Sequence, residues 1–193
     1  MICPPGVFDA AGALFYRNAA NGAFMFTSRY RLSDSESLFQ TASMYPDVFK
    51  PRPAESHKGT YGTLAVIGGA EGMGGAVVLA ATAAAYAGCG KVWAGFNQRQ
   101  LPFAVIDGRP EIMLATAQNL LLRNDADARA VGCGLGLGEA ASGIVAAALS
   151  EADGKPLLLD ADALTLLSRS SELQRLAVQH GNLILTPHPA EAA

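Results

Sequence analysis

Four segments of the chain carry residue types that bind ligands, and each follows a short apolar run. Two are rich in glycine, which lets backbone N–H groups approach a ligand closely. The other two contain acids, which can hold Mg²⁺ through water or orient a hydroxyl group, and a histidine. These segments are Gly68–Gly75, Gly132–Gly138, Asp160–Asp162 and Thr186–Glu191.

The glycine-rich segments indicate contact with a large ligand, although neither matches a standard nucleotide motif. Gly68–Gly75 precedes a predicted helix, whose positive end favours an anion. Both segments lack the G-x-G-x-x-G spacing, and the P-loop lysine is missing, so Rossmann and P-loop sites are disfavoured. A tight strand-to-helix turn without a ligand is the alternative for Gly68–Gly75. Cys133 is interpreted as a small buried residue, because no histidine or lysine is close to it in sequence.

The acidic and histidine segments allow more than one interpretation. Asp162 is well placed to cap the next helix, and with Asp160 it could instead hold Mg²⁺ through water; we weigh the two alternatives equally. His188 lies between two prolines, which stiffen the backbone and make it a better ligand contact than most histidines. Glu191 is expected in the first turn of a new helix, where an acid is favoured.

The elements that position these segments follow an alternating pattern. Apolar strands that alternate with helices predict a parallel sheet covered on both faces. Ligands in such sheets bind beyond the carboxyl ends of the strands, so the four segments should converge on one edge. Strands are expected near residues 63–67, 91–94, 111–116, 129–131, 156–159 and 183–185, and helices near 76–87, 142–150, 162–168 and 171–180.

Residues 1–56 differ from the rest of the chain. They show no lasting strand or helix period, so we expect an irregular N-terminal arm that ends in a Pro-rich linker, with one short helix near Glu36–Ser43. A native leader that packs on a neighbouring subunit is the alternative. Residues 57–193 should form the α/β domain.

Composition excludes several classes of protein. The chain has 193 residues, 50% of them hydrophobic, which suffices for one well-buried domain. A net charge of -3 and 7% aromatic residues argue against a nucleic-acid partner. The longest apolar stretch, near Ala76–Ala87, is too short to span a bilayer, so no membrane partner is expected. An odd number of cysteines fits a reducing compartment, and we expect a soluble, cytoplasmic protein.

Taken together, these segments resemble the ADP- or ATP-dependent NAD(P)H-hydrate dehydratase family. The resemblance implies a ribokinase-like fold with three α/β/α layers around a mainly parallel sheet, expected here to be incomplete. The matching stretches occur in the family's order over residues 56–193. They are Ser56–Gly62, Ala65–Gly69 with Gly72–Ala76, Arg109–Glu111, Gly132–Gly136, Leu159–Leu164 and Leu185–Glu191.

What the resemblance implies is repair of hydrated NADH or NADPH, whose nicotinamide ring has taken up water. ADP or ATP would be the co-substrate, with Mg²⁺ shielding the phosphoryl group. By the same resemblance, Ala76, Gly134, Gly136 and His188 should contact the hydrated dinucleotide, and Glu191 is a candidate for a metal-linked water. A homo-oligomer is also expected.

The family's pattern continues beyond the matched residues. Relatives have a Lys-Gly segment and then a Gly-x-Gly-Asp segment, whose aspartate is the expected catalytic base. Neither occurs in the 193 residues, so no catalytic residue is identified and the aspartate is expected beyond residue 193. The chain alone should then bind the hydrate without dehydrating it. Two alternatives stay open: another ribokinase-like kinase, for example of a thiamin precursor, and a non-catalytic, truncated nucleotide-binding protein.

Overall fold

The computed structural model describes residues 14–17, 24–27, 43–44, 52–151, 154–189 and 191. The chain divides into two compact units, Met1–Ser56 and His57–Ala193. In the first unit, β1 (Leu14–Arg17) and β2 (Phe24–Thr27) pair antiparallel, which the sequence analysis did not predict. Apart from Ser43, the helix expected near Glu36–Ser43 lies outside the described residues.

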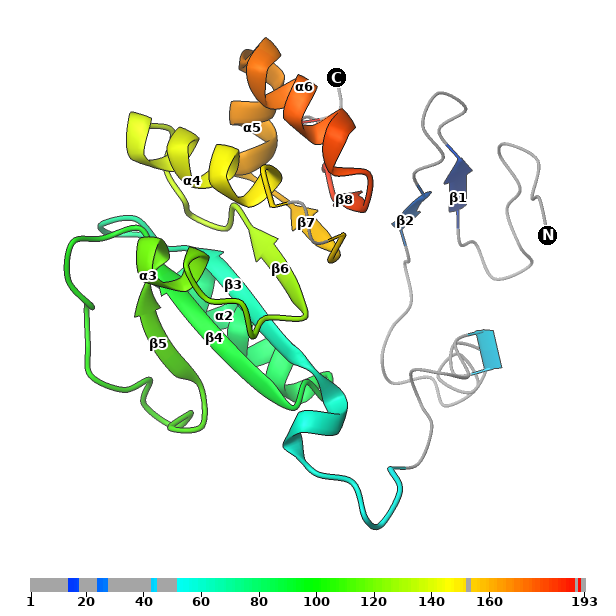
Figure 1. Ribbon diagram of the computed structural model, residues 1–193, viewed down its shortest axis with the longest axis vertical. Helices are drawn as coiled ribbons and strands as arrows, with labels where there is room; N and C mark the ends of the chain where they lie inside the picture. Colours follow the sequence, from blue (N-terminus) through cyan, green and yellow to red (C-terminus); the bar gives the residue numbers. More distant parts are fainter. Residues whose placement is uncertain are drawn as a thin grey trace. The chain divides into compact units, whose positions relative to one another are not determined.

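The second unit is built on a six-stranded sheet in which every described pairing is parallel, in the order β5-β4-β3-β6-β7-β8 (Figure 1). This order confirms the predicted parallel α/β architecture. The strands are β3 (Thr63–Gly68), β4 (Lys91–Phe96), β5 (Met113–Thr116), β6 (Ala128–Val131), β7 (Leu157–Leu159) and β8 (Leu183–Leu185).

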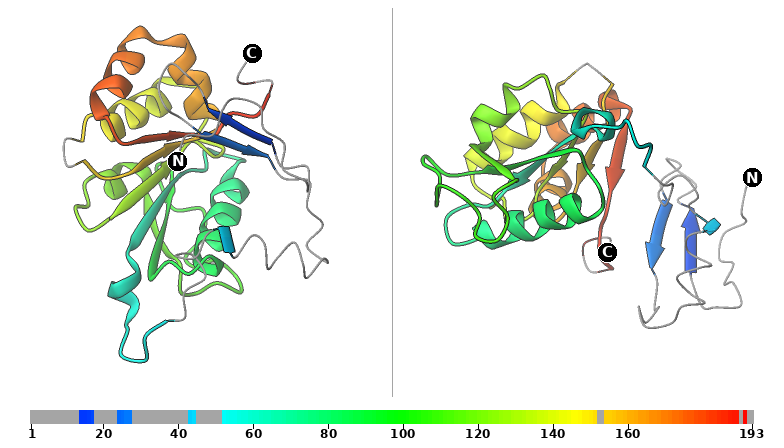
Figure 2. Two further views of the ribbon diagram at one scale, coloured as in Figure 1. Left: turned by 90° about the vertical axis from the view of Figure 1, so that its right-hand side faces the viewer. Right: turned by 90° about the horizontal axis from the view of Figure 1, so that it is seen from below.

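Helices cover both faces of this sheet and complete three layers (Figure 2). Successive residues of β3 point to opposite faces, as in any strand. Ala65 and Ile67 therefore join one core, whereas Val66 joins the other. Helix α2 (Gly74–Tyr86) packs on the Val66 face, and the opposite face is covered by α3 (Ala117–Leu121), α4 (Glu139–Leu149), α5 (Asp162–Arg169) and α6 (Ser171–His180).

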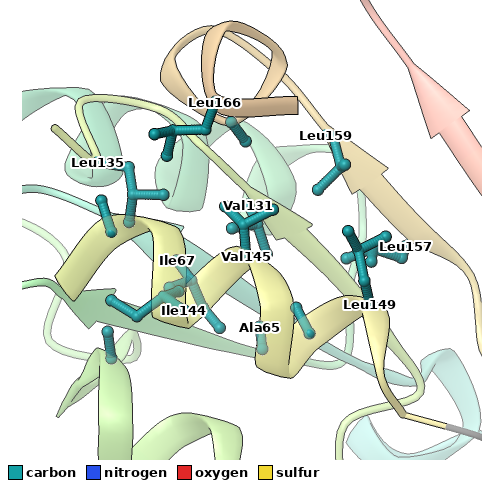
Figure 3. Packing of buried hydrophobic residues seen from close by; sticks show 14 of the residues in the cluster. Ala65, Ile67, Val131, Leu135, Ile144, Val145, Leu149, Leu157, Leu159 and Leu166 are labelled. Atoms are coloured by element: carbon teal, nitrogen blue, oxygen red, sulfur yellow. The ribbon is translucent and has the colours of Figure 1, made fainter. Parts of the chain in front are cut away.

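The larger core lies between the sheet and α4 (Figure 3). Strand side chains such as Ile67, Val131 and Leu159 are at most 1% exposed, and they pack with Ile144 and Val145 of α4. Burying one such side chain stabilises the fold by about 1.5–3 kcal/mol. This packing holds the strands in position against the helices, and so it also positions the loops that follow the carboxyl ends of the strands.

Helix α2 is apolar on nearly all sides, but only its inner side is buried, through Val77, Ala81 and Ala84. On its outer side Leu79 and Tyr86 are each 73% exposed. The Arg109 guanidinium lies 3.9 Å from the centre of the Tyr86 ring and pairs with Glu111 at 3.3 Å. Among the described residues, no helix has the length and apolar character needed to cross a membrane.

Candidate functional site

The four chemistry-bearing segments follow four strands that are neighbours in the sheet. Gly68–Gly75 follows β3, Gly132–Gly138 follows β6, Asp160–Asp162 follows β7 and Thr186–Glu191 follows β8. Because these strands are parallel, their carboxyl ends meet at one edge. The topology therefore brings together the segments that the sequence analysis selected.

The two glycine loops are hydrogen-bonded to each other. The backbone N–H of Gly69 donates to the Cys133 carbonyl at 3.0 Å, and that of Ala70 donates to the Gly134 carbonyl at 2.7 Å. A side chain on Gly68 would lie 2.1 Å from the Cys133 carbonyl oxygen, so only glycine allows this approach. The expectation that these N–H groups face a ligand is therefore wrong for Gly69 and Ala70, which use them to join the loops.

Three of the predicted substrate residues form one row along the joined loops. A Cβ atom on Gly134 would lie 3.2 Å from the Ala76 side chain, and one on Gly136 would lie 3.4 Å from that of Ala70. Both glycines have positive φ, of 61° and 84°. Helices α2 and α4, which begin beside this row, have no side-chain cap at their N-termini. The Ala76 N–H, in the first turn of α2, donates to the Met73 carbonyl at 3.2 Å, whereas no side chain caps the other N–H groups at the starts of α2 and α4, so these can meet an anionic ligand.

Asp162 does not cap α5, so the capping interpretation is wrong. It is the first residue of the helix, and its N-cap residue is Ala161, which makes no side-chain cap bond. Instead, Asp162 Oδ2 accepts a 2.8 Å hydrogen bond from the backbone N–H of Gly136. Ala161 has φ 49° and ψ -120°, a strained conformation for alanine that turns the chain sharply at this point. Asp162 therefore holds the second glycine loop in place.

Cys133 lies in the same loop and is not an activated nucleophile. Burial, mainly, and also the negative charges of Asp160 and Asp162 raise the pKa of its thiol to about 11. A thiol with so high a pKa carries almost no thiolate near neutral pH. Cys133 is partly rather than fully buried, and its raised pKa agrees with the expectation that it is not a nucleophile.

The segment after β8 turns back on itself. Thr186 donates its backbone N–H to the Leu159 carbonyl at 3.3 Å, which anchors the start of the segment beside β7. The His188 backbone N–H donates to Glu191 Oε2 at 3.1 Å, and the His188 ring Nε2 lies 3.4 Å from Oε1. The His188 side chain is 63% exposed, so part of its ring faces the solvent. Glu191 is in a turn.

A resident metal has no preformed cage in the described part of the chain, where no three histidine, cysteine or acidic side chains form a cluster. Mg²⁺ rarely needs such a cage, because it keeps several waters and is usually bound by one or two carboxylates and substrate phosphates. The Glu191 carboxylate, 21% exposed, fits that mode of binding.

The His57–Gly59 stretch has a different role from the four loops. It precedes β3, so it lies at the opposite, amino edge of the sheet, where Lys58–Tyr61 forms a short 3₁₀ helix. His57 Nδ1 accepts a 3.1 Å hydrogen bond from the Gly59 N–H and caps this helix. His57 therefore caps a helix at the edge of the sheet away from the candidate site.

Sequence reasoning missed the residues after β4, which also reach the carboxyl edge. The Asn97 side chain donates to the Leu135 carbonyl at 2.9 Å, and that of Gln98 to the carbonyls of Gly69 and Ala70 at 2.9 and 3.3 Å. These carboxamides brace both glycine loops. The available signal was a polar Asn97-Gln98-Arg99 run directly after a predicted strand.

The Asp162 contact leads to a first prediction. In Asp162→Ala the half-buried Gly136 N–H loses its acceptor, so the free energy of unfolding should fall by about 1–3 kcal/mol. Asp162→Asn keeps an acceptor oxygen and should lose less. Urea denaturation followed by circular dichroism measures both variants. An Asp162→Ala variant as stable as the parent would show that this bond does not hold the loop.

The fold and the site define the class of protein first. An all-parallel sheet covered on both faces, with glycine loops at its carboxyl edge, is an α/β architecture that binds small molecules. It is similar to a ribokinase-like superfamily protein from Enterococcus faecalis, with a TM-score of 0.67 and 25% identity over 77% of this chain and 53% of that one. The architecture is therefore ribokinase-like, as expected.

The particular family follows from the sequence comparison. The model of the NAD(P)H-hydrate dehydratase family matches residues 64–193. The chain belongs to this family, which confirms the resemblance drawn from its motifs.

Individual relatives agree with this assignment. An ADP-dependent (S)-NAD(P)H-hydrate dehydratase from Neisseria meningitidis is 63% identical over 156 residues, which cover 81% of this chain and 53% of the relative. The ADP/ATP-dependent NAD(P)H-hydrate dehydratase from Bacillus subtilis, co-crystallised with ATP and Mg²⁺, has a TM-score of 0.56 and 28% identity over 76% of this chain and 51% of that one. The chain thus spans about half the length of each of these two proteins.

Proposed function

We propose that this protein acts in the ADP-dependent dehydration of hydrated NADH and NADPH, and that its residues 57–193 supply the surface that binds the hydrated dinucleotide. The observation that carries the proposal is the pair of joined glycine loops. They bring Ala76, Gly134 and Gly136 into one row at the carboxyl edge of the sheet. Family membership and the names of the relatives support the same substrate.

The row has room for a ring at Gly136 rather than at Gly134. A Cβ atom on Gly136 would be in ordinary contact with the Ala70 side chain, at 3.4 Å, so the hydrated nicotinamide ring can lie against the backbone there. Gly134, in contrast, is already packed against Met73 and Ala76. The uncapped N-termini of α2 and α4 favour the negative charge of the dinucleotide's phosphates. His188, exposed at the end of β8, would donate or accept a hydrogen bond at the hydrated ligand.

The nucleotide and the metal belong to the same proposal. The relatives' names indicate ADP or ATP as co-substrate, and Mg²⁺ accompanies ATP in the Bacillus subtilis crystals. When bound, Mg²⁺ neutralises charge on the phosphoryl group that activates the ring hydroxyl. Glu191, whose carboxylate is oriented by the His188 N–H, is the residue of this chain that we propose holds it through water.

The alternative of a thiamin-precursor kinase is less well supported. The matching family model and the Neisseria meningitidis relative are both described as hydrate dehydratases. Nothing in the described site favours a second function over this one.

A chimeric enzyme tests the proposal. Residues 57–193 would replace the matching residues of the Neisseria meningitidis relative, which is 63% identical over the matched region. The chimera should restore NADH from its (6S)-hydrate when ADP and Mg²⁺ are added, measured as the rise in absorbance of the reduced nicotinamide ring. A folded chimera that leaves the hydrate unchanged would contradict the proposal.

His188→Ala in this chimera should raise KM for the hydrate. Losing a hydrogen bond to a charged ligand costs about 1.5–3 kcal/mol, or roughly ten- to hundredfold in affinity. His57→Ala is the matched control, because His57 lies at the opposite edge of the sheet. Equal KM values for His188→Ala and the unaltered chimera would remove His188 from the substrate site.

A further inference from the structure

A cavity of about 690 Å³ opens at the carboxyl edge beside the glycine row. Binding sites for small ligands are typically about 300–1,000 Å³. The cavity is bounded by the loops after β3 and β4, by the end of β5 with helix α3, and by the start of α4. None of the residues proposed above to bind the nicotinamide end lines it. The side chains that matter for its chemistry are Glu71, Asn97, Gln98, Arg99, Gln118 and Asn119.

The lining combines one cation with one acid. Among the described residues that line it, Arg99 carries the positive charge and Glu71 the negative charge. Both side chains are exposed, and within the described part of the chain neither takes part in a recorded ion pair. The guanidinium and the carboxylate are thus available to a ligand.

This set of groups matches a phosphorylated sugar. A guanidinium pairs with phosphate oxygens in a planar, bidentate fashion. A carboxylate accepts hydrogen bonds from ribose hydroxyls, as acids do in many dinucleotide sites. The exposed carboxamides of Gln118 and Asn119 can donate to either group.

The cavity is continuous with the glycine row. Ala70 lines the cavity, and its side chain also lies 3.4 Å from where a Cβ atom of Gly136 would be. The Gln98 side chain, on the cavity wall, holds the Ala70 carbonyl at 3.3 Å. Ala70 therefore lies between Gly136 and the cavity, so a ligand with its nicotinamide against Gly136 is one residue away from the cavity.

We infer that this cavity binds the phosphorylated ribose in the adenosine half of the hydrated dinucleotide, with Arg99 on a phosphate and Glu71 on a ribose hydroxyl. The inference rests on the proposed function, because it places the far end of the same substrate. It adds a site, separate from Ala76, Gly134, Gly136 and His188, at which NADPH and NADH hydrates can be told apart.

Equilibrium binding of four probes to the 193-residue chain, measured by calorimetry, tests the inference. The probes are NADPH, NADH, reduced nicotinamide mononucleotide, which lacks the adenosine half, and adenosine 2′,5′-bisphosphate, which lacks the nicotinamide. The variants are Arg99→Gln and Glu71→Gln. Arg169→Gln is the matched control, because Arg169 is an exposed arginine at the end of α5, outside the cavity.

Arg99→Gln should weaken binding of NADPH and of adenosine 2′,5′-bisphosphate by about tenfold or more, while its affinity for the mononucleotide should equal that of the parent chain. The Arg169→Gln variant should bind all four probes with the parent's affinity. If Arg99 pairs with the 2′-phosphate, NADH affinity should not change; if it pairs with the pyrophosphate, NADPH and NADH should weaken together. Glu71→Gln should weaken NADH, whose ribose keeps its 2′-hydroxyl, more than NADPH.

Other outcomes overturn the inference. Probes that bind the parent and the Arg99→Gln variant equally would place the adenosine half elsewhere and leave the proposed function intact. Arg99-dependent binding of the bisphosphate, without binding of any nicotinamide ligand, would keep the cavity site and remove the proposed function. A parent chain that binds none of the four probes would contradict both.

Discussion

Replacing Gly132 with alanine is expected to lower the free energy of unfolding by about 4 kcal/mol or more, in the range of the most damaging single substitutions. Gly132 has φ 133°, a conformation that residues with side chains rarely adopt. A Cβ atom would lie 1.8 Å from the Asp160 carbonyl oxygen and 2.8 Å from the Ala163 side chain. That carbonyl accepts the Ala163 N–H at 3.1 Å, so it cannot move without opening the start of α5.

Gly143→Ala is the matched control for this prediction. Gly143 lies inside α4, and a Cβ atom there would meet nothing within 4 Å. Alanine should stabilise the helix by about 0.5–1 kcal/mol, because glycine loses more conformational freedom on folding. Urea denaturation of both variants should therefore give shifts of opposite sign. A Gly132→Ala variant that unfolds like the parent would contradict the packing of the second glycine loop on the Asp160 turn.

Phe96→Ala should cost about 3–5 kcal/mol of stability, as truncation of a buried aromatic side chain usually does. Phe96 is fully buried, and its ring meets that of Phe103 edge to face with centroids 5.3 Å apart. The ring also lies under the first glycine loop, where a Cβ atom on Gly69 would come within 2.9 Å of it. Removing the ring therefore leaves a cavity beneath the loop as well as in the core.

Leu122→Ala is the control for the Phe96 truncation, because Leu122 is 80% exposed and should change stability by no more than about 0.5 kcal/mol. Thermal unfolding of the two variants measures the difference. Phe96→Ala should in addition weaken binding of NADPH at the glycine row. Loss of stability without any change in NADPH affinity would show that the ring supports the core but not the loop.

The fold was largely predictable because its strands are short apolar runs bounded by glycine or polar residues. The run at residues 63–67 became β3, Thr63–Gly68, and the run at 183–185 became β8. Parallel strands buried on both faces read as continuous apolar stretches, which a sequence shows directly. The expected strand at residues 111–116 begins only at Met113, because the residues before it form a turn in which the Ile112 N–H donates to the Arg109 carbonyl at 3.2 Å.

The features that sequence reasoning missed depend on contacts between distant residues. Helix α3 has only five residues, too few to show a helical period. Arg129 lies in the middle of β6 and is 5% exposed, because its guanidinium pairs with Glu151 and donates to the Arg123 carbonyl at 2.9 Å. Charge alone would have placed this side chain at the surface.

The site shows the same division between local and distant causes. The positions of the four loops follow from the strand order, which alternating strands and helices predict. The bond from Gly136 to Asp162 joins residues 26 apart, whereas a capping interpretation considers only the nearest turn. The cavity beside Arg99 is likewise formed by two loops and by parts of β5, α3 and α4 that are far apart in sequence, so no single motif predicts it.

Calorimetric titration of the 193-residue chain with (6S)-hydrated NADPH is the most direct test of the central claim, that the glycine row binds the hydrated nicotinamide. We predict saturable binding that is weakened in Ala76→Leu, whose larger side chain would disturb the close packing of Ala76 against Gly134, and unchanged in Ala147→Leu, a substitution at an exposed position of α4. Binding of a hydroxymethylpyrimidine by the parent chain, together with no binding of the hydrate, would contradict the account.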